Sequence, residues 1–526
     1  MESVRLTLTL IAALLTVAPA VAEATQRPPG AGLHFEECIT AKQPVLDEPR
    51  TPLTGGCKLT RTVAGDGEGS AINDLFGLTP SPDGRSLYAV SSTDDAVSAF
   101  TTRPLALDQC FTTDRQLRGR HAQPCQLLPH SGTEDANSGL NGLNSVAVSP
   151  GGRDVYTTSV DGSIATFAHA PSGKLTYSRC ITGSLEKFGS AANGSCRPIS
   201  TATDNPYGLY SGLAGPRSLT FSPDGRFVYV SIGQESGIAT LARGRSGSLR
   251  FVSCVRFSSR YYYTGPSPSP CRLVISEAGY PNQSGLLAPT WTAASPDGTS
   301  LYVTSSRGAT IGEFRRNRRT GALTYEGCLS TANRRPLPDD PCRRIPRRSK
   351  PNVKNGGIPG LREIAVTPDG TGVYGVSGYD NAVFAFARNT VTGRLSYSSC
   401  VTGERNPERN GTGPCNTLAA ATRKGDGSGL STPRAMALSE DGRSLFVGAA
   451  GDAAIARFRI TRGGGLHWIG CLTARQEAVD PCARAHAKGG GPQRLGIGGI
   501  NSLTVVGHDL YAATGATASV SRFSFR

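Results

Sequence analysis

The stretch SPDGRFVYVSIGQESGIATLARGRSGSLRFVSC, from Ser222 to Cys254, holds the turn and the last three strands of one repeat of this 526-residue chain. Its Asp-Gly turn separates two runs rich in valine and aromatic residues, and glycine supplies the positive φ that a hairpin turn needs. A further run ends at Leu241, and another has the form Leu-x-aromatic-x-x-Cys. The pattern predicts four strands per repeat, A before the turn and B, C and D after it.

The turn recurs along the whole chain. It is SPDG or a close variant in six copies, which begin at Ser81, Ser149, Ser222, Ser295, Thr367 and Ser439, and a degenerate seventh copy begins at Val505. Every strand B carries one aromatic residue at the same place, and such a column is typical of packing between neighbouring sheets rather than of a binding stripe. The column consists of Tyr88, Tyr156, Tyr229, Tyr302, Tyr374, Phe446 and Tyr511.

The two ends of the chain complete each other. Leu33 to Cys38 (LHFEEC) has the form of a strand D with no A, B or C before it, whereas Ser502 to Phe525 supplies A, B and C with no D after them. Together with six whole repeats they make seven four-stranded sheets. The sequence therefore predicts an all-β, seven-bladed propeller over residues 33–526, whose last blade is closed by the N-terminal strand.

Fourteen cysteines follow the same period and fall into seven couples. The couples are 38/57, 110/125, 180/196, 254/271, 328/342, 400/415 and 471/482, or Cys38, Cys57, Cys110, Cys125, Cys180, Cys196, Cys254, Cys271, Cys328, Cys342, Cys400, Cys415, Cys471 and Cys482 in full. No couple has the short spacing of a zinc site, and the seven histidines do not follow the repeat, so we expect disulfides and neither a metal nor a cofactor. All D-to-A connections of a propeller share one face, so the seven disulfide-stapled loops are expected to form a rim around one mouth of the channel.

The N-terminal segment predicts export. It has an early Arg5, an apolar run and the small residues Ala20 and Ala22, which together are typical of a signal peptide over residues 1–22, with a flexible lead-in over residues 23–32. A membrane anchor is the alternative, but it needs roughly 20 uninterrupted apolar residues. An even set of cysteines is also stable in an oxidising space. We expect a secreted or extracytoplasmic monomer with no membrane span.

The chain is basic, with a formal net charge of +15 and an isoelectric point near 9.3, which favours anionic surroundings. Its densest basic segment, residues 331–354, carries eight cations against Asp339 and Asp340 and follows the strand D that ends at Cys328. This segment is a candidate site for a polyanion, and a solvated basic loop is the alternative. Nucleic acid is disfavoured, because no aromatic residues for base stacking are interleaved with the cations.

The start of each strand A faces the channel, so these positions were compared across the blades. They form a polar ring of candidate ligand-binding residues: Asn73, Asn144, Arg217, Thr290, Arg362, Arg434 and Asn501. Buried cations need partners, so either the ring binds an anion or the channel is a water-filled structural feature. Glu363 is a candidate general base, and the alternative is an ion pair with Arg434 of the next blade.

The succession SPDGRxLYV, D-x-A-V-x-x-F and T-G-x-L, the last at Thr392, Gly393 and Leu395, resembles the lactonase-type seven-bladed propellers, which are related to YVTN-type repeats. The resemblance covers nearly all of the mature chain. It implies a sugar-lactone hydrolase or a lactone-forming cyclase that works at the central channel. Lactonase-type propellers often show a histidine where strand A begins, and no blade of this chain has one there.

The sequence leaves three functions open. The first is an exported propeller that binds a small anion, a glycan or a surface protein through its channel and stapled rim. The second is the lactone chemistry that the resemblance implies, and the third is a structural component of the cell envelope. The chain has no G-x-S-x-G, H-E-x-x-H or P-loop sequence, which disfavours the enzymes that these motifs mark.

Overall fold

The structure is a computed structural model that describes residues 31–41, 57–60, 69–113, 125–128, 139–185, 196–204, 208–257, 269–274, 286–330, 342–345, 358, 360–405, 415–474, 482–484 and 496–526. The expected signal peptide, residues 23–30 of the lead-in and most residues between paired cysteines lie outside this part of the chain. Within it, no helix is long and apolar enough to cross a membrane.

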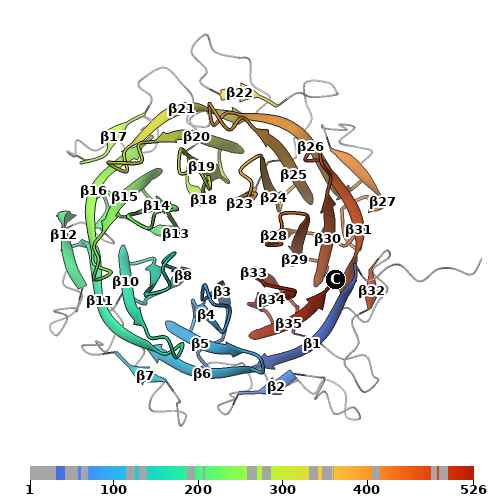
Figure 1. Ribbon diagram of the computed structural model, residues 1–526, viewed down its shortest axis with the longest axis horizontal. Helices are drawn as coiled ribbons and strands as arrows, with labels where there is room; N and C mark the ends of the chain where they lie inside the picture. The colour runs from blue at the N-terminus through green and yellow to red at the C-terminus, as the bar shows by residue number, and fades with distance from the viewer. Residues whose placement is uncertain are drawn as a thin grey trace, which may run out of the picture.

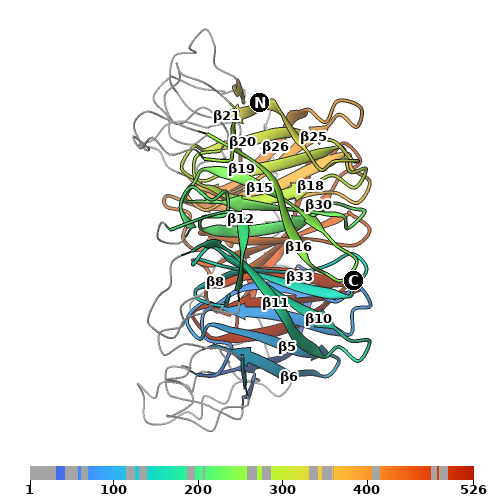
Figure 2. The same cartoon turned by 90° about the vertical axis from the view of Figure 1, so that its left-hand side faces the viewer.

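Seven β-sheets surround a central axis in the described part of the chain (Figure 1). Seen from the side, the ring is a thick disc (Figure 2). Each sheet has five strands, of which the inner four are antiparallel, and the hydrophobic core lies between neighbouring sheets. The predicted all-β, seven-bladed propeller is confirmed.

The first three blades follow the chain from the inner strand outward. Blade 1 contains β3 (Leu75–Pro80), β4 (Ser86–Ser91), β5 (Ala96–Thr102), β6 (Leu105–Thr112) and β7 (Gln126–Leu127). Blade 2 contains β8 (Leu143–Val148), β9 (Asp154–Ser159), β10 (Ser163–His169), β11 (Leu175–Ser184) and β12 (Cys196–Thr203). Blade 3 contains β13 (Pro216–Phe221), β14 (Phe227–Ile232), β15 (Gly237–Arg243), β16 (Leu249–Arg256) and β17 (Arg272–Leu273).

The next three blades repeat this order. Blade 4 contains β18 (Pro289–Ala294), β19 (Ser300–Ser305), β20 (Thr310–Arg316), β21 (Leu323–Ser330) and β22 (Cys342–Arg344). Blade 5 contains β23 (Leu361–Val366), β24 (Gly372–Ser377), β25 (Ala382–Arg388), β26 (Leu395–Glu404) and β27 (Asn416–Thr422). Blade 6 contains β28 (Pro433–Leu438), β29 (Ser444–Ala449), β30 (Ala454–Ile460), β31 (Leu466–Thr473) and β32 (Ala483–Arg484).

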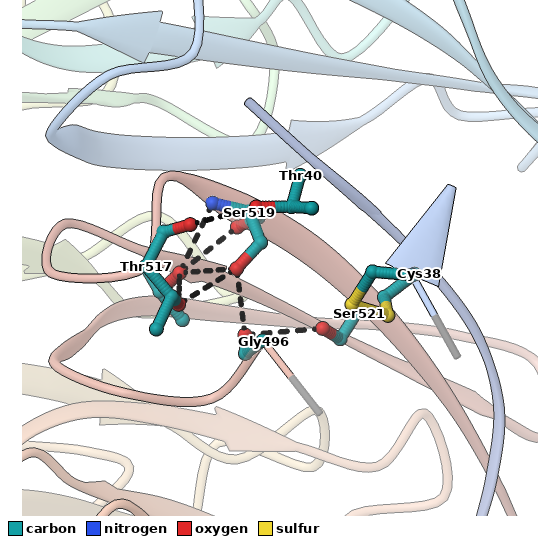
Figure 3. The surroundings of a disulfide bond; sticks show 8 residues. Cys38, Thr40, Gly496, Thr517, Ser519 and Ser521 are labelled. Carbon is teal, nitrogen blue, oxygen red and sulfur yellow. Dashed lines mark hydrogen bonds between the residues drawn. A yellow bond between two sulfur atoms is a disulfide. The ribbon is translucent and has the colours of Figure 1, made fainter. Parts of the chain in front are cut away.

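The seventh blade joins the two ends of the chain. It contains β33 (Ile500–Val506), β34 (Asp509–Thr514), β35 (Ser519–Phe525), β1 (Leu33–Thr40) and β2 (Cys57–Leu59), with β1 paired antiparallel to β35. The Thr40 hydroxyl donates to the Thr517 carbonyl at 2.9 Å, and the Ser519 and Ser521 hydroxyls donate to the Gly496 carbonyl beside the Cys38 disulfide (Figure 3). Closure by the N-terminal strand is confirmed.

The expectation of four strands per blade was one strand short. A fifth strand runs parallel to strand D and begins at or next to the second cysteine of each couple, as in the register pairs Cys38 with Cys57 and Cys328 with Cys342. All seven expected disulfides are formed, with Cα–Cα distances of 4.2 to 4.6 Å, and no cysteine is free. Each disulfide therefore clamps the returning chain onto the outer edge of its own blade.

Disulfides in this number persist in oxidising compartments such as the periplasm or the cell exterior, which supports the expectation of export. The lead-in is not wholly separate from the propeller. Ala31 is fully buried, and its carbonyl accepts a hydrogen bond from Arg457 of blade 6 at 3.3 Å. The last two residues of the expected flexible segment are thus part of the folded ring.

The aromatic column packs between sheets, as expected, and it also makes polar links that the pattern did not show. Each of its six tyrosines is fully buried and donates its hydroxyl to a backbone carbonyl of the next blade, from Tyr88 to Gly173 and so on around the ring. Tyr302 additionally accepts a hydrogen bond from Nε of Arg388, whose side chain is fully buried and paired with Asp297. These contacts fix the angle between neighbouring blades.

Substitution of Tyr302 by phenylalanine should cost more stability than the same change at Tyr374. Tyr302→Phe leaves the Gly393 carbonyl and the Nε–H group of the buried Arg388 without a partner, although Arg388 keeps its pair with Asp297. Tyr374→Phe leaves only the Gly464 carbonyl without its donor. We expect losses of about 3 and about 1 kcal/mol, respectively, in urea unfolding with the disulfides intact. Equal shifts of the two unfolding midpoints would show that the arginine link contributes nothing.

Candidate functional site

The second residue of each inner strand faces the channel, and these positions line one cavity of about 420 Å³. Six of the seven residues expected in the ring lie there: Asn144, Arg217, Thr290, Arg362, Arg434 and Asn501. In blade 1 the position belongs to Phe76, not to the expected Asn73. Asn73 lies three residues earlier, is buried, and uses its backbone N–H to bind Asp94. Phe76 lies five positions before Ser81, the same spacing to the turn as in the other blades, whereas the polar Asn73 lies eight positions before it.

The short polar members of the ring join adjacent blades. The Asn144 and Asn501 side-chain amides donate to the carbonyls of Pro216 and Leu75, the first residues of the next inner strands, at 3.1 and 2.9 Å. Thr290 donates its hydroxyl to the corresponding carbonyl, that of Leu361, at 3.3 Å. These three residues are therefore engaged in holding the ring together.

The three arginines are placed differently, because their side chains are exposed within the cavity. Arg434 donates a hydrogen bond to Asn501 at 3.3 Å. Arg217 and Arg362 form neither a hydrogen bond nor an ion pair with any described residue. Partial burial lowers the pKa of both guanidinium groups, and the positive charges of Arg307 and Arg362 lower that of Arg217 further. The cavity thus holds uncompensated positive charge.

Glycine at position 233 makes room for one of these arginines. A Cβ atom added to Gly233 would lie 2.4 Å from Nε of Arg217, and Gly233 has no positive φ that would itself require glycine. The corresponding Gly378 of blade 5 has space, since the nearest atom to its added Cβ is 3.5 Å away. The position of the Arg217 side chain therefore depends on the absence of a side chain at Gly233, the first residue of the turn after β14.

Glu363 lines the cavity but is committed to the backbone. Its Oε2 atom accepts a hydrogen bond from the N–H of Met436 in blade 6 at 2.7 Å, and Ser502 accepts the equivalent bond from Leu78 at 3.1 Å. Burial raises the pKa of the Glu363 carboxyl to about 8, against the effect of this hydrogen bond. The alternative ion pair with Arg434 is not among the contacts of the described residues. The role of general base stays a hypothesis.

Buried carboxylates in the B-to-C turns hold the segments that lead into the ring, a role that was not predicted from the sequence. Asp452 accepts hydrogen bonds from the N–H groups of Gly427, Gly429 and Ser431 at 2.8 to 3.1 Å. Asp94 and Glu235 do the same in blades 1 and 3, and burial raises their pKa values to about 6 and about 7. The sequence signal for these carboxylates is the recurrence of an acidic residue in the B-to-C turn of several blades.

The other expected features lie away from the cavity. The described histidines, His34, His169, His467 and His508, belong to outer strands or to the opposite ends of the hairpins, and none of them lines it. In the basic segment 331–354, Arg343 binds Glu313 at 2.7 Å, so one of its cations is used within the protein. Its cations other than Arg343 and Arg344 lie outside the described residues.

No protein-family model and no curated protein matches the sequence. The fold resembles lactonase-type propellers. A putative 6-phosphogluconolactonase from Bacteroides uniformis is 16% identical over 74% of this chain and 83% of its own, with a TM-score of 0.45. The periplasmic gluconolactonase of Pseudomonas aeruginosa is 14% identical over 82% of this chain and 93% of its own, also at 0.45.

A propeller of a different kind reaches a comparable TM-score. The β-propeller domain of Cps50 (Swd1) from Myceliophteria thermophila is 9% identical over 86% of this chain and 98% of its own, with a TM-score of 0.47. At these identities and scores the likeness concerns the propeller fold and carries nothing about activity.

Glu363→Gln should change how stability depends on pH. The folded pKa of about 8 lies above the ordinary value of 4.5, so protonated Glu363 contributes stability that is complete below pH 4.5 and is lost as the pH rises through 8. Glutamine keeps an oxygen for the Met436 N–H and does not titrate. When the free energy of unfolding in urea is measured at pH 5 and at pH 9, it should fall less between the two pH values in the variant than in the wild type. Parallel pH curves would contradict the buried, protonated carboxyl.

Proposed function

We propose that the protein is an exported binding propeller that holds a small anionic ligand in its channel through Arg217, Arg362 and Arg434. The observation that carries this proposal is the pair of guanidinium groups, on Arg217 and Arg362, that have no hydrogen-bond or ion-pair partner among the described residues although they share one cavity. A guanidinium group that is partly withdrawn from water, as these two are within the cavity, gains from a partner, because partial desolvation of its charge is costly.

A bound anion would relieve this cost. Each guanidinium offers N–H donors in a fork that fits a carboxylate or a phosphate, and such charge-assisted bonds are stronger than neutral ones. The charges of Arg362 and Arg434 also repel each other across adjacent blades, which lowers the pKa of Arg362. An anion between them would remove that repulsion, and a rigid ring loses little entropy when it binds.

The stapled rim supports the same function. Seven disulfides hold the outer strands, and each lies in the connection between a strand D and the next inner strand, near whose start the channel positions stand. A rim held in this way presents a surface at a small entropic cost. A glycan or a surface protein remains a ligand that such a rim would suit, and its recognition would use the same channel mouth.

Lactone hydrolysis is the alternative function. The residues that line the cavity support it less well than they support anion binding. It needs a base or an activated water beside the cationic groups. Glu363 is the one carboxyl among the residues that line the cavity, and it is buried and bound to a backbone N–H. A structural role in the envelope would need no ligand at all.

Removal of two channel arginines should strongly weaken anion binding. We expect Arg362→Gln/Arg434→Gln to weaken the binding of citrate, measured by isothermal titration calorimetry, by about 100-fold, since each charge-assisted contact contributes roughly 1.5 to 3 kcal/mol. Arg250→Gln, at an exposed position on outer strand β16, is the matched control and should bind as the wild type does.

Two results would count against the proposal. Equal binding by the double variant and the wild type would place the anion elsewhere on the basic surface. Turnover of sugar lactones by the wild type, lost in Glu363→Gln and in the double variant, would replace binding by the enzymatic alternative.

Gly233→Ala should weaken anion binding without removing any charge. The added methyl group would meet Arg217 at 2.4 Å and displace its side chain, whereas Gly378→Ala adds the same group where there is space. We expect Gly233→Ala to bind citrate about tenfold more weakly than the wild type, and Gly378→Ala to bind it with the affinity of the wild type. Identical affinities in both would show that Arg217 does not touch the ligand.

A further inference from the structure

The positive charges of the cavity lie on one side of it, where Trp291 of blade 4 also belongs to the lining. Blades 3, 5 and 6 contribute Arg217, Arg362 and Arg434, and Arg307 of blade 4 stands close enough to lower the pKa of Arg217. All four cations therefore come from four consecutive blades, and they form an arc around one half of the channel mouth.

The opposite half is uncharged and partly apolar. Blades 7, 1 and 2 contribute Asn501, Phe76, Asn144 and Val160 to the lining. Phe76 exposes 40% of its surface and Val160 37%, which places both among the few large apolar side chains that the described chain leaves exposed. Blade 1 alone has an aromatic residue at the second position of its inner strand, where the other blades have arginine, asparagine or threonine.

Contacts within the protein hold the residues of this apolar side in place. The side-chain amides of Asn501 and Asn144, in the blades on either side of Phe76, are hydrogen-bonded to the backbones of the next blades. These amides are therefore not free to cover the phenyl group of Phe76. Val160 lies against Gly142, where an added Cβ would approach its Cγ2 atom to 2.6 Å. A side chain at Gly142 would push Val160 away from this place.

We propose that the ligand of the cavity is an amphiphilic anion, with at least two carboxylate or phosphate groups toward the arginine arc and an apolar body, such as an aromatic ring, against Phe76 and Val160. This inference rests on the proposed function and adds the chemical class. The cavity of about 420 Å³ suits a molecule of this size, since small-molecule sites are typically 300 to 1,000 Å³. Burial of apolar surface against Phe76 would add affinity that a purely polar anion lacks.

Two tricarboxylates of equal charge separate these contributions. Tricarballylate has an open aliphatic skeleton, and benzene-1,3,5-tricarboxylate has an aromatic one. By isothermal titration calorimetry at pH 8, we expect the wild type to bind the aromatic acid at least tenfold more tightly. Phe76→Asn installs the residue that blades 2 and 7 have at this position, and it should bring the two affinities together by weakening the aromatic acid alone.

A pair of isosteric variants provides the control. Val160→Thr should reduce the preference for the aromatic acid about threefold, whereas Val252→Thr, at an equally exposed valine on β16 outside the cavity, should leave it unchanged. If neither acid binds, the proposed function itself fails. If both bind equally well to the wild type, or if Phe76→Asn weakens both acids equally, anion binding stands and the apolar half of the site is overturned.

Discussion

The inner edge of each blade is the constraint on which the rest of this molecule depends. An innermost strand has no neighbouring strand on its channel side, so backbone groups there need other partners. Side chains of the adjacent blade supply them: Asn144, Thr290 and Asn501 donate to carbonyls, and Glu363 and Ser502 accept from N–H groups. The same residues that line the channel therefore also hold the ring together.

This double use explains why the polar ring was hard to interpret from the sequence. An asparagine at the channel is as well suited to joining blades as to binding a ligand, and the composition of the ring does not tell these roles apart. The arginines differ, because their guanidinium groups extend into the cavity beyond the strand edges. The sequence predicts a base or an ion-pair partner for Glu363, because the pattern of side chains does not indicate which backbone N–H groups lack a partner. The structure shows that Glu363 binds one of them, the N–H of Met436.

Features with a period were predictable. The turn, the tyrosine column, the cysteine couples and the split blade recur or complete one another, so their places in the propeller follow from topology alone. Features that no repeated sequence motif marks were not predictable, even where they recur in several blades. The fifth strands are as short as two residues and carry no alternating pattern. The links from Arg243, Arg316 and Arg388 to the tyrosine of the preceding blade join residues 86 or 87 positions apart. Phe76 does not share the polarity of the other ring members.

Closure of the last blade has a consequence for the order of folding. The Thr40 and Thr517 that meet in blade 7 are separated by 477 residues, whereas the Cys38–Cys57 disulfide spans only 19. The first strand can acquire its covalent clamp as soon as Cys57 reaches an oxidising space, but its antiparallel partner β35 is made more than 470 residues later. The ring therefore stays open, with β1 unpaired on one side, until β35 is available to pair with it.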